Sequence, residues 1–210
     1  MKLYLIRHAQ SLRNVGQEHD RLSETGIEQA KRLGLFLKDN HIDYIYCSQK
    51  GRTKETLSYI NKYIKAPTTF TEKIQEQNTG IFEEKSDKEF FYHMMALKLK
   101  VKEYAEYKPE GNGENLFEVE KRAQEFLNII KEKHKFNDHI LIVSHATFLK
   151  FLIIRLLKLH IKEAQYFNIH NASLSTFELD KKFNVKEYLV DDYIHLLKYS
   201  SYPRETVEKI

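Results

Sequence analysis

The sequence of 210 residues contains a single cysteine, and this scarcity excludes two kinds of structural support. One cysteine cannot form an internal disulfide, and it cannot build a zinc site made of cysteines. Cys47 falls within the apolar run 42–47, so we expect a small buried side chain there. A chain without disulfides is typical of a reducing compartment, and we expect a cytoplasmic protein.

Long hydrophobic segments are also missing. Only four apolar residues stand between Lys2 and Arg7, which is too short for the apolar region of a secretory signal. The most apolar later stretch, residues 148–159, is interrupted by Lys150, Arg155 and Lys158. Such a segment does not span a bilayer, so no membrane partner is expected.

Charge of one sign forms no block in this chain. The chain has 34 basic and 30 acidic residues, so its net charge is +4. This small excess does not indicate a nucleic-acid partner. Only eight of the basic residues are arginine, so a bidentate role is considered for each arginine before a solvated one. The length and the hydrophobic content of 41% predict one domain with a substantial core.

Short apolar runs alternate with helical patterns along most of the chain. Runs that predict strands occupy residues 2–6, 42–47, 139–143, 174–179 and 185–190. Patterns that predict helices occupy residues 25–37, 53–64, 115–133 and 147–159. Thr25 and Asn115 each open a sequence typical of a capping box. This alternation predicts an α/β fold with a parallel sheet.

The segment from about residue 80 to 113 interrupts the alternation. It contains an aromatic and apolar cluster at 90–97, then lysines among apolar residues, then Tyr104 and Tyr107. We expect a helical insertion that is either a lid or a peripheral helix with a solvated lysine face. As a lid it would let the mouth of a pocket accept an apolar, an aromatic or a second anionic group.

Reactive side chains follow three of the predicted strands. The first strand ends at Arg7 and His8, with Asn14 soon after, the second is followed by Arg52, and the third by His145. Ligands of open α/β sheets lie outside the carboxyl ends of the strands, so these side chains can meet in one pocket. Guanidinium groups match phosphate oxygens, and imidazoles can donate to these oxygens or attack phosphorus.

The same residues resemble the motifs of the histidine phosphatases, the phosphoglycerate mutase-like superfamily. Its first motif is an apolar strand followed by Arg-His-Gly-x-Thr/Ser-x-x-Asn, which residues 5–14 match apart from the glycine. Further segments that resemble family motifs, in the family's order, are residues 22–30, 48–56, 74–83, 113–115, 143–146 and 171–173. The resemblance covers about residues 1–180.

Five positions depart from the family's pattern. Ala9 and Ala146 stand where glycines are usual, and each adds a methyl group beside a histidine. Lys50 replaces an apolar residue, Glu55 replaces a glutamine and Glu84 replaces a glycine. None of these changes removes a charged catalytic group, so we expect them to affect the choice of substrate.

The resemblance implies a fold and a set of roles. The fold would be a three-layer α/β/α sandwich with a mostly parallel central sheet, in a single histidine phosphatase domain over 1–210 with a lid insertion at about 80–113. His8 would be the nucleophile and would form a phosphohistidine. Arg7, Arg52 and His145 would clamp the phosphate oxygens as charge spreads over them, and Asn14 would be a neutral donor to the phosphate.

The general acid that the resemblance implies is Glu76, which would protonate the leaving group and then take a proton from water. Glu83 and Glu84 are close enough in the sequence to compete for this role. Glu114 is either a pocket residue or a helix-start residue that the helix dipole favours. The other eight histidines show no metal-ligand spacing and are interpreted as structural or surface residues, so neither a metal nor a cofactor is expected.

These observations predict a metal-independent phosphomonoesterase that acts on a small phosphorylated metabolite. The alternative within the family is a phosphoglycerate mutase, but the chain length and the short insertion after the acid segment resemble the compact phosphatases more. A non-catalytic phosphoryl-binding scaffold would usually lack one of the two histidines, and both are present. A homodimer is left open.

Overall fold

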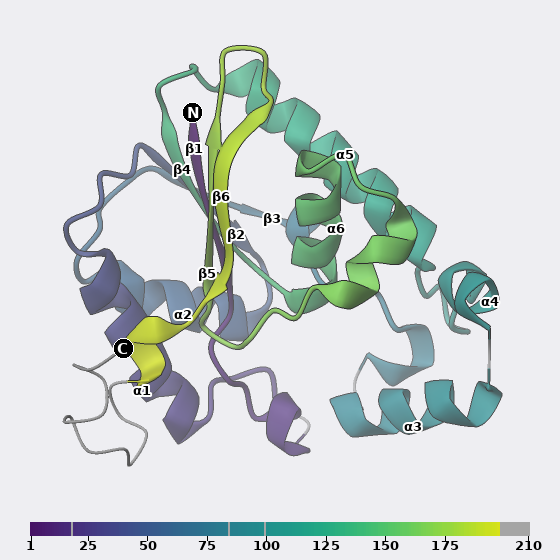
Figure 1. Cartoon of the computed structure of the whole chain (residues 1–210). Helices are drawn as coiled ribbons and strands as arrows, with labels where there is room; N and C mark the ends of the chain where they lie inside the picture. The colour runs from purple at the N-terminus through teal and green to yellow at the C-terminus, as the bar shows by residue number, and fades with distance from the viewer. Residues whose placement is uncertain (18, 84, 99, 198–210) are drawn as a thin grey trace, which may run out of the picture.

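The computed structural model describes residues 1–17, 19–83, 85–98 and 100–197. Its centre is a six-stranded sheet in the order β3-β2-β4-β1-β5-β6, with helices on both faces (Figure 1). The predicted three-layer α/β/α arrangement is therefore confirmed. The last 13 residues of the predicted domain, 198–210, lie outside the described residues.

The strands are β1 (Lys2–Arg7), β2 (Tyr44–Ser48), β3 (Thr68–Thr71), β4 (His139–Ser144), β5 (Leu174–Leu179) and β6 (Val185–Asp192). The pairs β1–β4, β4–β2 and β2–β3 are parallel, whereas β5 is antiparallel to both β1 and β6. Arg7 is in register with Ser144, so the residues that follow β1 and β4 lie side by side. The sequence patterns did not indicate β3, because this strand is four residues long, lies at an edge and has no fully buried residue.

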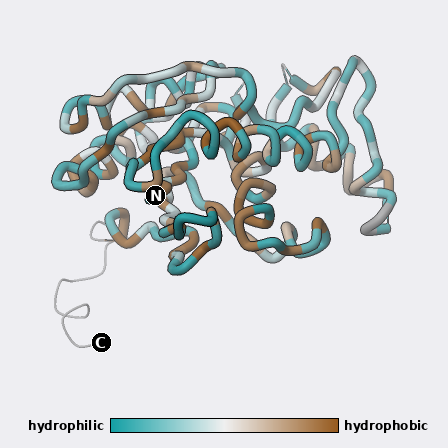
Figure 2. Tube along the Cα trace, turned by 90° about the horizontal axis from the view of Figure 1, so that it is seen from above, coloured by the Kyte–Doolittle hydropathy of each residue, from teal (hydrophilic) through white to brown (hydrophobic). Residues whose placement is uncertain are grey.

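Two groups of helices cover the sheet. The helices α1 (Glu24–Leu37), α2 (Gly51–Ile60) and α7 (Ile194–Leu197) pack on one face, and α5 (Leu116–Lys133) and α6 (Ala146–Leu156) pack on the other. Short 3-10 helices are η1 (Arg13–Val15), η2 (Glu72–Ile74), η3 (Gly80–Phe82) and η4 (Ile161–Tyr166). Hydrophobic and hydrophilic residues alternate along the helical turns of the trace, as expected for helices with one face on a core (Figure 2).

The central strands separate two hydrophobic clusters. Along β1, Leu5 belongs to the cluster under α5 and α6, while the next residue, Ile6, belongs to the cluster under α1 and α2. Successive strand residues point to opposite faces, so a strand buried on both faces is apolar throughout, as predicted. Cys47 is fully buried, and this burial raises the pKa of its thiol to about 12.

The start of α1 differs from the prediction. Its N-cap is Ser23, whose side chain accepts a hydrogen bond from the amide of Gly26, so the predicted capping box at Thr25 is wrong by two residues. Ser23 also donates its own amide to the carbonyl of Gln10, which holds it extended just before the helix. Gly26 must be glycine here, because a Cβ atom would lie 1.9 Å from the Gln10 oxygen. The predicted capping box at Asn115 is confirmed.

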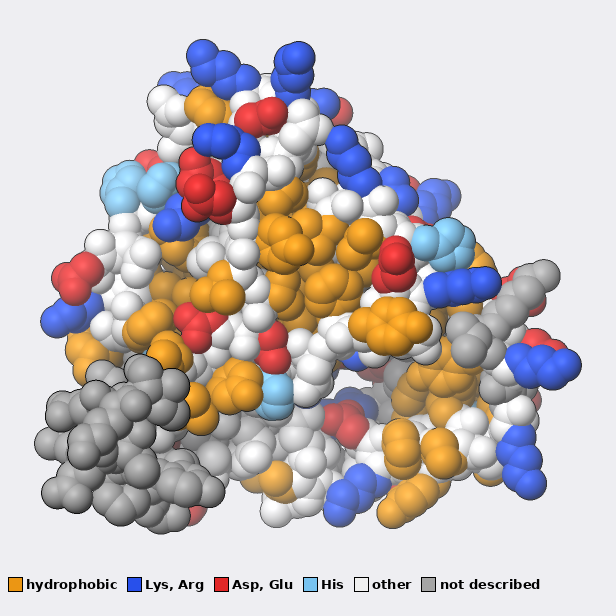
Figure 3. Space-filling model, viewed as in Figure 1, with side chains coloured by type: hydrophobic (Ala, Val, Ile, Leu, Met, Phe, Trp, Pro, Cys, Tyr) orange, Lys and Arg blue, Asp and Glu red, His pale blue; other side chains and the backbone are white. Residues whose placement is uncertain are grey.

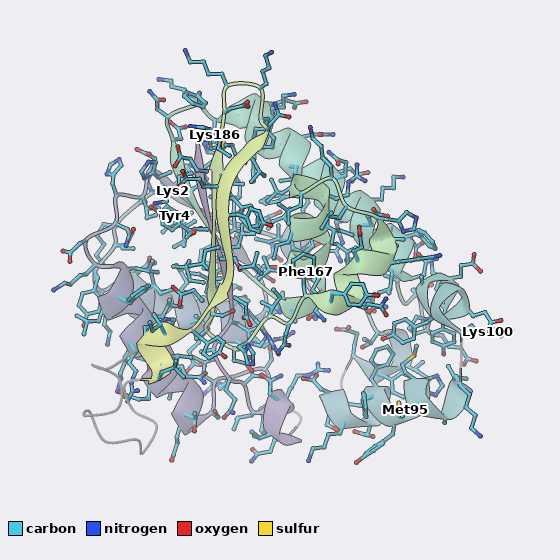
Figure 4. All side chains as sticks on the ribbon, viewed as in Figure 1. Lys2, Tyr4, Met95, Lys100, Phe167 and Lys186 are labelled. Carbon is cyan, nitrogen blue, oxygen red and sulfur yellow. The ribbon has the colours of Figure 1, made fainter. Side chains whose placement is uncertain are left out.

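The segment between η3 and α5 forms two helices, α3 (Asp87–Leu97) and α4 (Val101–Glu106), which confirms its helical character. No residue of α3 is buried, and Phe91, Tyr92 and Met95 are all more than half exposed. Met95 and Lys100 lie at the outer edge of the molecule, whereas Tyr4 lies within the sheet (Figure 4). Among the described residues, no helix is long and apolar enough to cross a bilayer.

Candidate active site

Four basic side chains meet at the carboxyl ends of the parallel strands. His8 and His145 follow β1 and β4 directly, and their ring centroids lie 5.2 Å apart. Arg52, in the first turn of α2, places its Nε atom 3.2 Å from Nε2 of His8. Arg7 ends β1 and donates to the carbonyl of Ile169 at 2.6 Å. We call these four residues the strand-end pocket, and the predicted convergence of the strand ends is confirmed.

The surroundings of His8 define its ionisation and its tautomer. Its Nδ1 atom lies 2.8 Å from the carbonyl oxygen of Ala9, which can only accept, so Nδ1 carries the proton and donates it. Burial lowers the pKa of His8 well below its ordinary value, and the positive charges of Arg52 and Arg7 lower it further. The ring is therefore neutral, with an unprotonated Nε2 atom that accepts from Arg52.

His145 is neutral for the same physical reasons. Burial is the largest cause of its lowered pKa, followed by the charge of Arg52. Its Nε2 atom lies 2.8 Å from the hydroxyl of Ser48, while its Nδ1 atom is buried and has no hydrogen-bond partner in the described part of the chain. The Nε atom of Arg7 is buried and unpartnered in the same way. Because unpaired buried polar groups are unfavourable, these two atoms mark a place for a polar ligand.

Asp20 is a site residue that the sequence analysis missed. One of its carboxylate oxygens lies 2.5 Å from the guanidinium of Arg52, and the other accepts from the amide of Gly51 at 2.5 Å. These bonds hold the first turn of α2, and with it Arg52, against the loop that follows η1. The only signal in the sequence is an acidic residue shortly before Leu22, which is weak because acidic residues are common in loops.

Glu76 lies at the beginning of α6, beside His145. Its Oε1 atom accepts from the amide of Thr147 at 3.0 Å and from the amide of Phe148 at 3.3 Å. Glu83 does not lie there, since it accepts from Lys50 at 2.9 Å and from the amide of Thr79. Glu84 lies outside the described residues. Of the described candidates for the acid, the structure thus brings only Glu76 to the helix that carries His145.

The loop that carries Glu76 is held by an ion pair. Arg122 of α5 donates to the carbonyl of Gln75 at 2.7 Å and to the carbonyl of Glu76 at 3.3 Å. Glu114 binds Arg122 at 2.8 Å and accepts from the amide of Asn78 at 2.9 Å. Glu114 is therefore a brace for this loop. Arg122 was missed, because nothing in its local sequence separates it from a solvated helical arginine.

Asn14 lies near His8 but turns its amide group elsewhere. Its Oδ1 atom accepts from the amide of Ser11 at 2.9 Å and from Asn171 at 3.2 Å, and Asn171 also donates to the carbonyl of His8. Its Nδ2 atom, the predicted phosphate donor, donates to Asp87 of α3 at 2.7 Å. In this structure the carboxylate of Asp87, an anionic group from α3, therefore accepts the hydrogen bond that Asn14 was predicted to donate to phosphate.

Acidic and metal-binding side chains are otherwise sparse at the site. Within residues 1–17, 19–83, 85–98 and 100–197, no group of three or more histidine, cysteine, aspartate or glutamate side chains is arranged to hold a metal ion. The positive charge at the site comes from Arg7 and Arg52. Ala9, one of the two alanines at glycine positions, is fully buried beside His8.

Comparisons with known proteins agree with this geometry. The model of the histidine phosphatase superfamily (branch 1) matches residues 3–192. Phosphoserine phosphatase 1 of Hydrogenobacter thermophilus is 30% identical over 88% of this chain and 90% of its own. The adenosylcobalamin/alpha-ribazole phosphatase of Escherichia coli is 25% identical over 87% of this chain and 92% of its own. The solved structure of Bacillus stearothermophilus YhfR superimposes with a TM-score of 0.80 at 26% identity, covering 93% and 98% of the two chains.

Proposed function

The chain belongs to the histidine phosphatase superfamily, and we propose that it hydrolyses the phosphate monoester of a small metabolite through a phosphohistidine on Nε2 of His8. The observation that carries this proposal is the state of His8. Its ring is buried and neutral, its Nδ1 proton is donated to Ala9, and its Nε2 lone pair faces Arg52. A neutral imidazole held in this tautomer is ready to attack phosphorus.

In the first step, Nε2 of His8 forms a bond to phosphorus while the bond from phosphorus to the ester oxygen breaks. Arg7, Arg52 and His145 donate to the three non-bridging oxygens, on which negative charge accumulates. The unpartnered Nε of Arg7 and Nδ1 of His145 support this role, because each needs an acceptor. Glu76, in its protonated form, gives its proton to the leaving alkoxide.

In the second step, a water molecule attacks the phosphohistidine. The carboxylate of Glu76 takes a proton from this water as its oxygen bonds to phosphorus, and the bond from phosphorus to Nε2 breaks. Inorganic phosphate leaves, and His8 returns to its neutral form. Each group named in this mechanism comes from one chain, so the reaction does not require a homodimer. A cytoplasmic location fits a substrate that is a phosphorylated metabolite and a chain with one buried cysteine.

The proposal is tested by replacing the nucleophile. His8→Ala should lower the turnover of p-nitrophenyl phosphate by at least about a thousandfold, because no covalent intermediate can form. The matched control is His41→Ala, since His41 is largely exposed and lies away from the strand ends. Circular dichroism shows whether both variants are folded, and mass spectrometry of acid-labile phosphoryl adducts tests for the intermediate. Retained turnover in folded His8→Ala would remove His8 as the nucleophile.

The second candidate is phosphoryl transfer back to the substrate, as in a phosphoglycerate mutase. A coupled assay with 3-phosphoglycerate separates the two reactions, because a phosphatase releases inorganic phosphate. Rapid formation of 2-phosphoglycerate with little free phosphate would contradict the phosphatase proposal.

A further inference from the structure

A cavity of about 750 Å³ adjoins the proposed general acid. Gln77 and Thr147 line one side of it, and the backbone amides of both donate to Oε1 of Glu76. The rest of the wall comes from α4, from the beginning of α5, from α6 and from η4. Since Glu76 would protonate the leaving group, a cavity beside Glu76 lies where the leaving group would emerge.

The wall of this cavity is mainly apolar. Leu116 and Phe117 contribute from α5, Phe151 from α6, and Tyr104 and Ile161 close the sides from α4 and η4. A volume of this size is typical of sites that bury a small organic molecule. The surface is also hollowed between α3 and the body of the molecule (Figure 3). The leaving group that fits here has an apolar body.

The polar part of the wall contains two lysines. Lys150, Lys162 and His160 line the cavity, and no acidic side chain of the described residues does. Lys150 stands one helical turn after Thr147, about 4.5 Å further along the axis of α6. The Lys150 side chain is half buried, and its ammonium group forms no hydrogen bond or ion pair with any described residue. Burial lowers the pKa of Lys150, and the charge of Glu76 opposes this effect.

We propose that this cavity binds the leaving group of the substrate and that Lys150 binds a second anionic group on it. The inference rests on the proposed phosphatase function and narrows its substrate class to phosphate monoesters that carry an apolar body and a carboxylate, or a further phosphate-like group. The unpaired ammonium supports this assignment, because an anion would supply the partner that the protein does not. The phosphate to be cleaved would bind in the strand-end pocket.

Lys150 could instead act only through Glu76, as a neighbouring positive charge. The two roles differ in what they predict for substrates. A positioning effect on Glu76 would change kcat for all monoesters alike and would shift the pH profile. Binding of an anionic leaving group would change kcat/KM only for substrates that carry the second charge, and mainly through KM.

The test compares two substrates that differ in one charge: the phosphate monoester of para-hydroxyphenylpropanoate and the corresponding monoester of its amide. Both release phenols of similar acidity. The variants are Lys150→Met, which removes the charge, Lys150→Arg, which keeps it, and Lys131→Met, an exposed lysine of α5, as the control. We expect the unaltered protein to prefer the acid over the amide by roughly 10- to 100-fold in kcat/KM, the range for a charge-assisted hydrogen bond.

Lys150→Met should reduce this preference to about one, while Lys150→Arg and Lys131→Met keep most of it. A third substrate, with a phosphonate in place of the carboxylate, distinguishes a preference for a dianion from one for a carboxylate. An unchanged acid-to-amide ratio in folded Lys150→Met would overturn the inference, as would equal losses on both substrates with a shifted pH profile. Turnover of the amide reports on the proposed function alone, so the two failures are distinguishable. If neither ester is turned over, calorimetric binding of both to His8→Ala gives the same ratio.

Discussion

The strand-end pocket and the α3 helix lie on adjacent parts of the molecule and are built in opposite ways. His8 and His145 are buried, and they directly follow β1 and β4. Each of these central strands is hydrogen-bonded to a neighbouring strand on both sides. No residue of α3 is buried, and the helix is held by Asp87, by ring contacts of Phe90 and His93 with Phe82, and by a hydrogen bond between His93 and Tyr107. The two histidines thus cannot move without disturbing the sheet, whereas α3 is not held in this way.

The strand-end pocket and α3 also differ in how far solvent screens their charges. In the strand-end pocket, burial keeps both histidines neutral beside two arginines. Asp20 pairs with Arg52, whereas Arg7 forms no ion pair with any described residue, so its charge has no direct anionic partner until an anion arrives. At α3, the carboxylate of Asp87 is half exposed and faces Arg13 at 3.6 Å. Solvent screens the half-exposed carboxylate, and this limits what the pair contributes to stability. A ligand therefore gains much from the pocket and can displace the contacts of α3 at small cost.

The first prediction contrasts the core beneath the pocket with α3. Phe126 packs edge-on against Tyr46 and Phe148 and is 1% exposed, so Phe126→Ala should lower the free energy of unfolding by about 3–5 kcal/mol. Phe91 is 58% exposed, so Phe91→Ala should change it by no more than about 0.5 kcal/mol. Urea unfolding measures both. Equal losses would show that α3 is part of the cooperative core.

The second prediction concerns the brace of Glu76. Arg122→Met removes the bonds to the carbonyls of Gln75 and Glu76, and we expect kcat to fall by roughly 10- to 100-fold for an alkyl phosphate, which needs a proton on its leaving group. The loss should be several-fold smaller for p-nitrophenyl phosphate, whose leaving group needs no acid. Arg155→Met, on the neighbouring helix, is the control. The same loss on both substrates would indicate a structural role alone.

The third prediction follows from the lowered pKa values in the pocket. His8 stays neutral when folded but binds a proton near pH 6.5 when unfolded, so the unfolded chain binds more protons below that pH. The stability that comes from His8 is present above pH 6.5 and is lost as the pH falls toward its folded pKa, by about 1.4 kcal/mol per pH unit.

Urea unfolding at pH 6 and pH 5 measures this loss. Between these values His8→Asn should lose up to about 1 kcal/mol less than the unaltered protein, whereas His41→Asn should behave like the unaltered protein. The same slope in His8→Asn and in the unaltered protein would show that His8 is not held neutral by burial.

The smallest predicted effect lies where the two regions meet. Asp87 binds the amide of Asn14 and places a negative charge close enough to Arg7 to raise its pKa against the effect of burial. Asp87→Asn should lower KM for a phosphate monoester by about two- to fivefold with kcat unchanged, because an exposed charge contributes under about 1 kcal/mol. Asp39→Asn, at the exposed end of α1, is the control. A higher KM would mean that Asp87 helps to hold the substrate.

Particular residues show how far the sequence could lead. The strands that end at Arg7 and Ser144 were predicted from apolar runs, and the helix after Asn115 from its capping box, because these signals lie within a few adjacent residues. The prediction of the helix start at Thr25 failed, since Gln10, distant in sequence, holds Ser23 extended. Edge strand β3 was missed because a short, half-exposed strand has no apolar run.

At the site, the positions of the predicted residues could be inferred from the sequence, but their hydrogen-bond partners could not. His8, Arg52 and His145 were found from their places after strands, because the carboxyl ends of parallel strands meet at one edge of the sheet. Asp20 and Arg122 were not found, because each acts through a hydrogen bond to a residue far along the chain. Their local sequences are those of ordinary charged surface residues.

The sequence by itself determined the α/β fold, the strand-end pocket and the class of chemistry, since these depend on local apolar patterns and on the parallel order of the strands. Only the tertiary structure decided that His8 is a neutral ring with an unprotonated Nε2, that Asn14 binds Asp87, and that a cavity with an unpaired Lys150 adjoins Glu76. Burial, tautomer and charge balance arise from the packing of distant segments, and no local pattern specifies which segments meet.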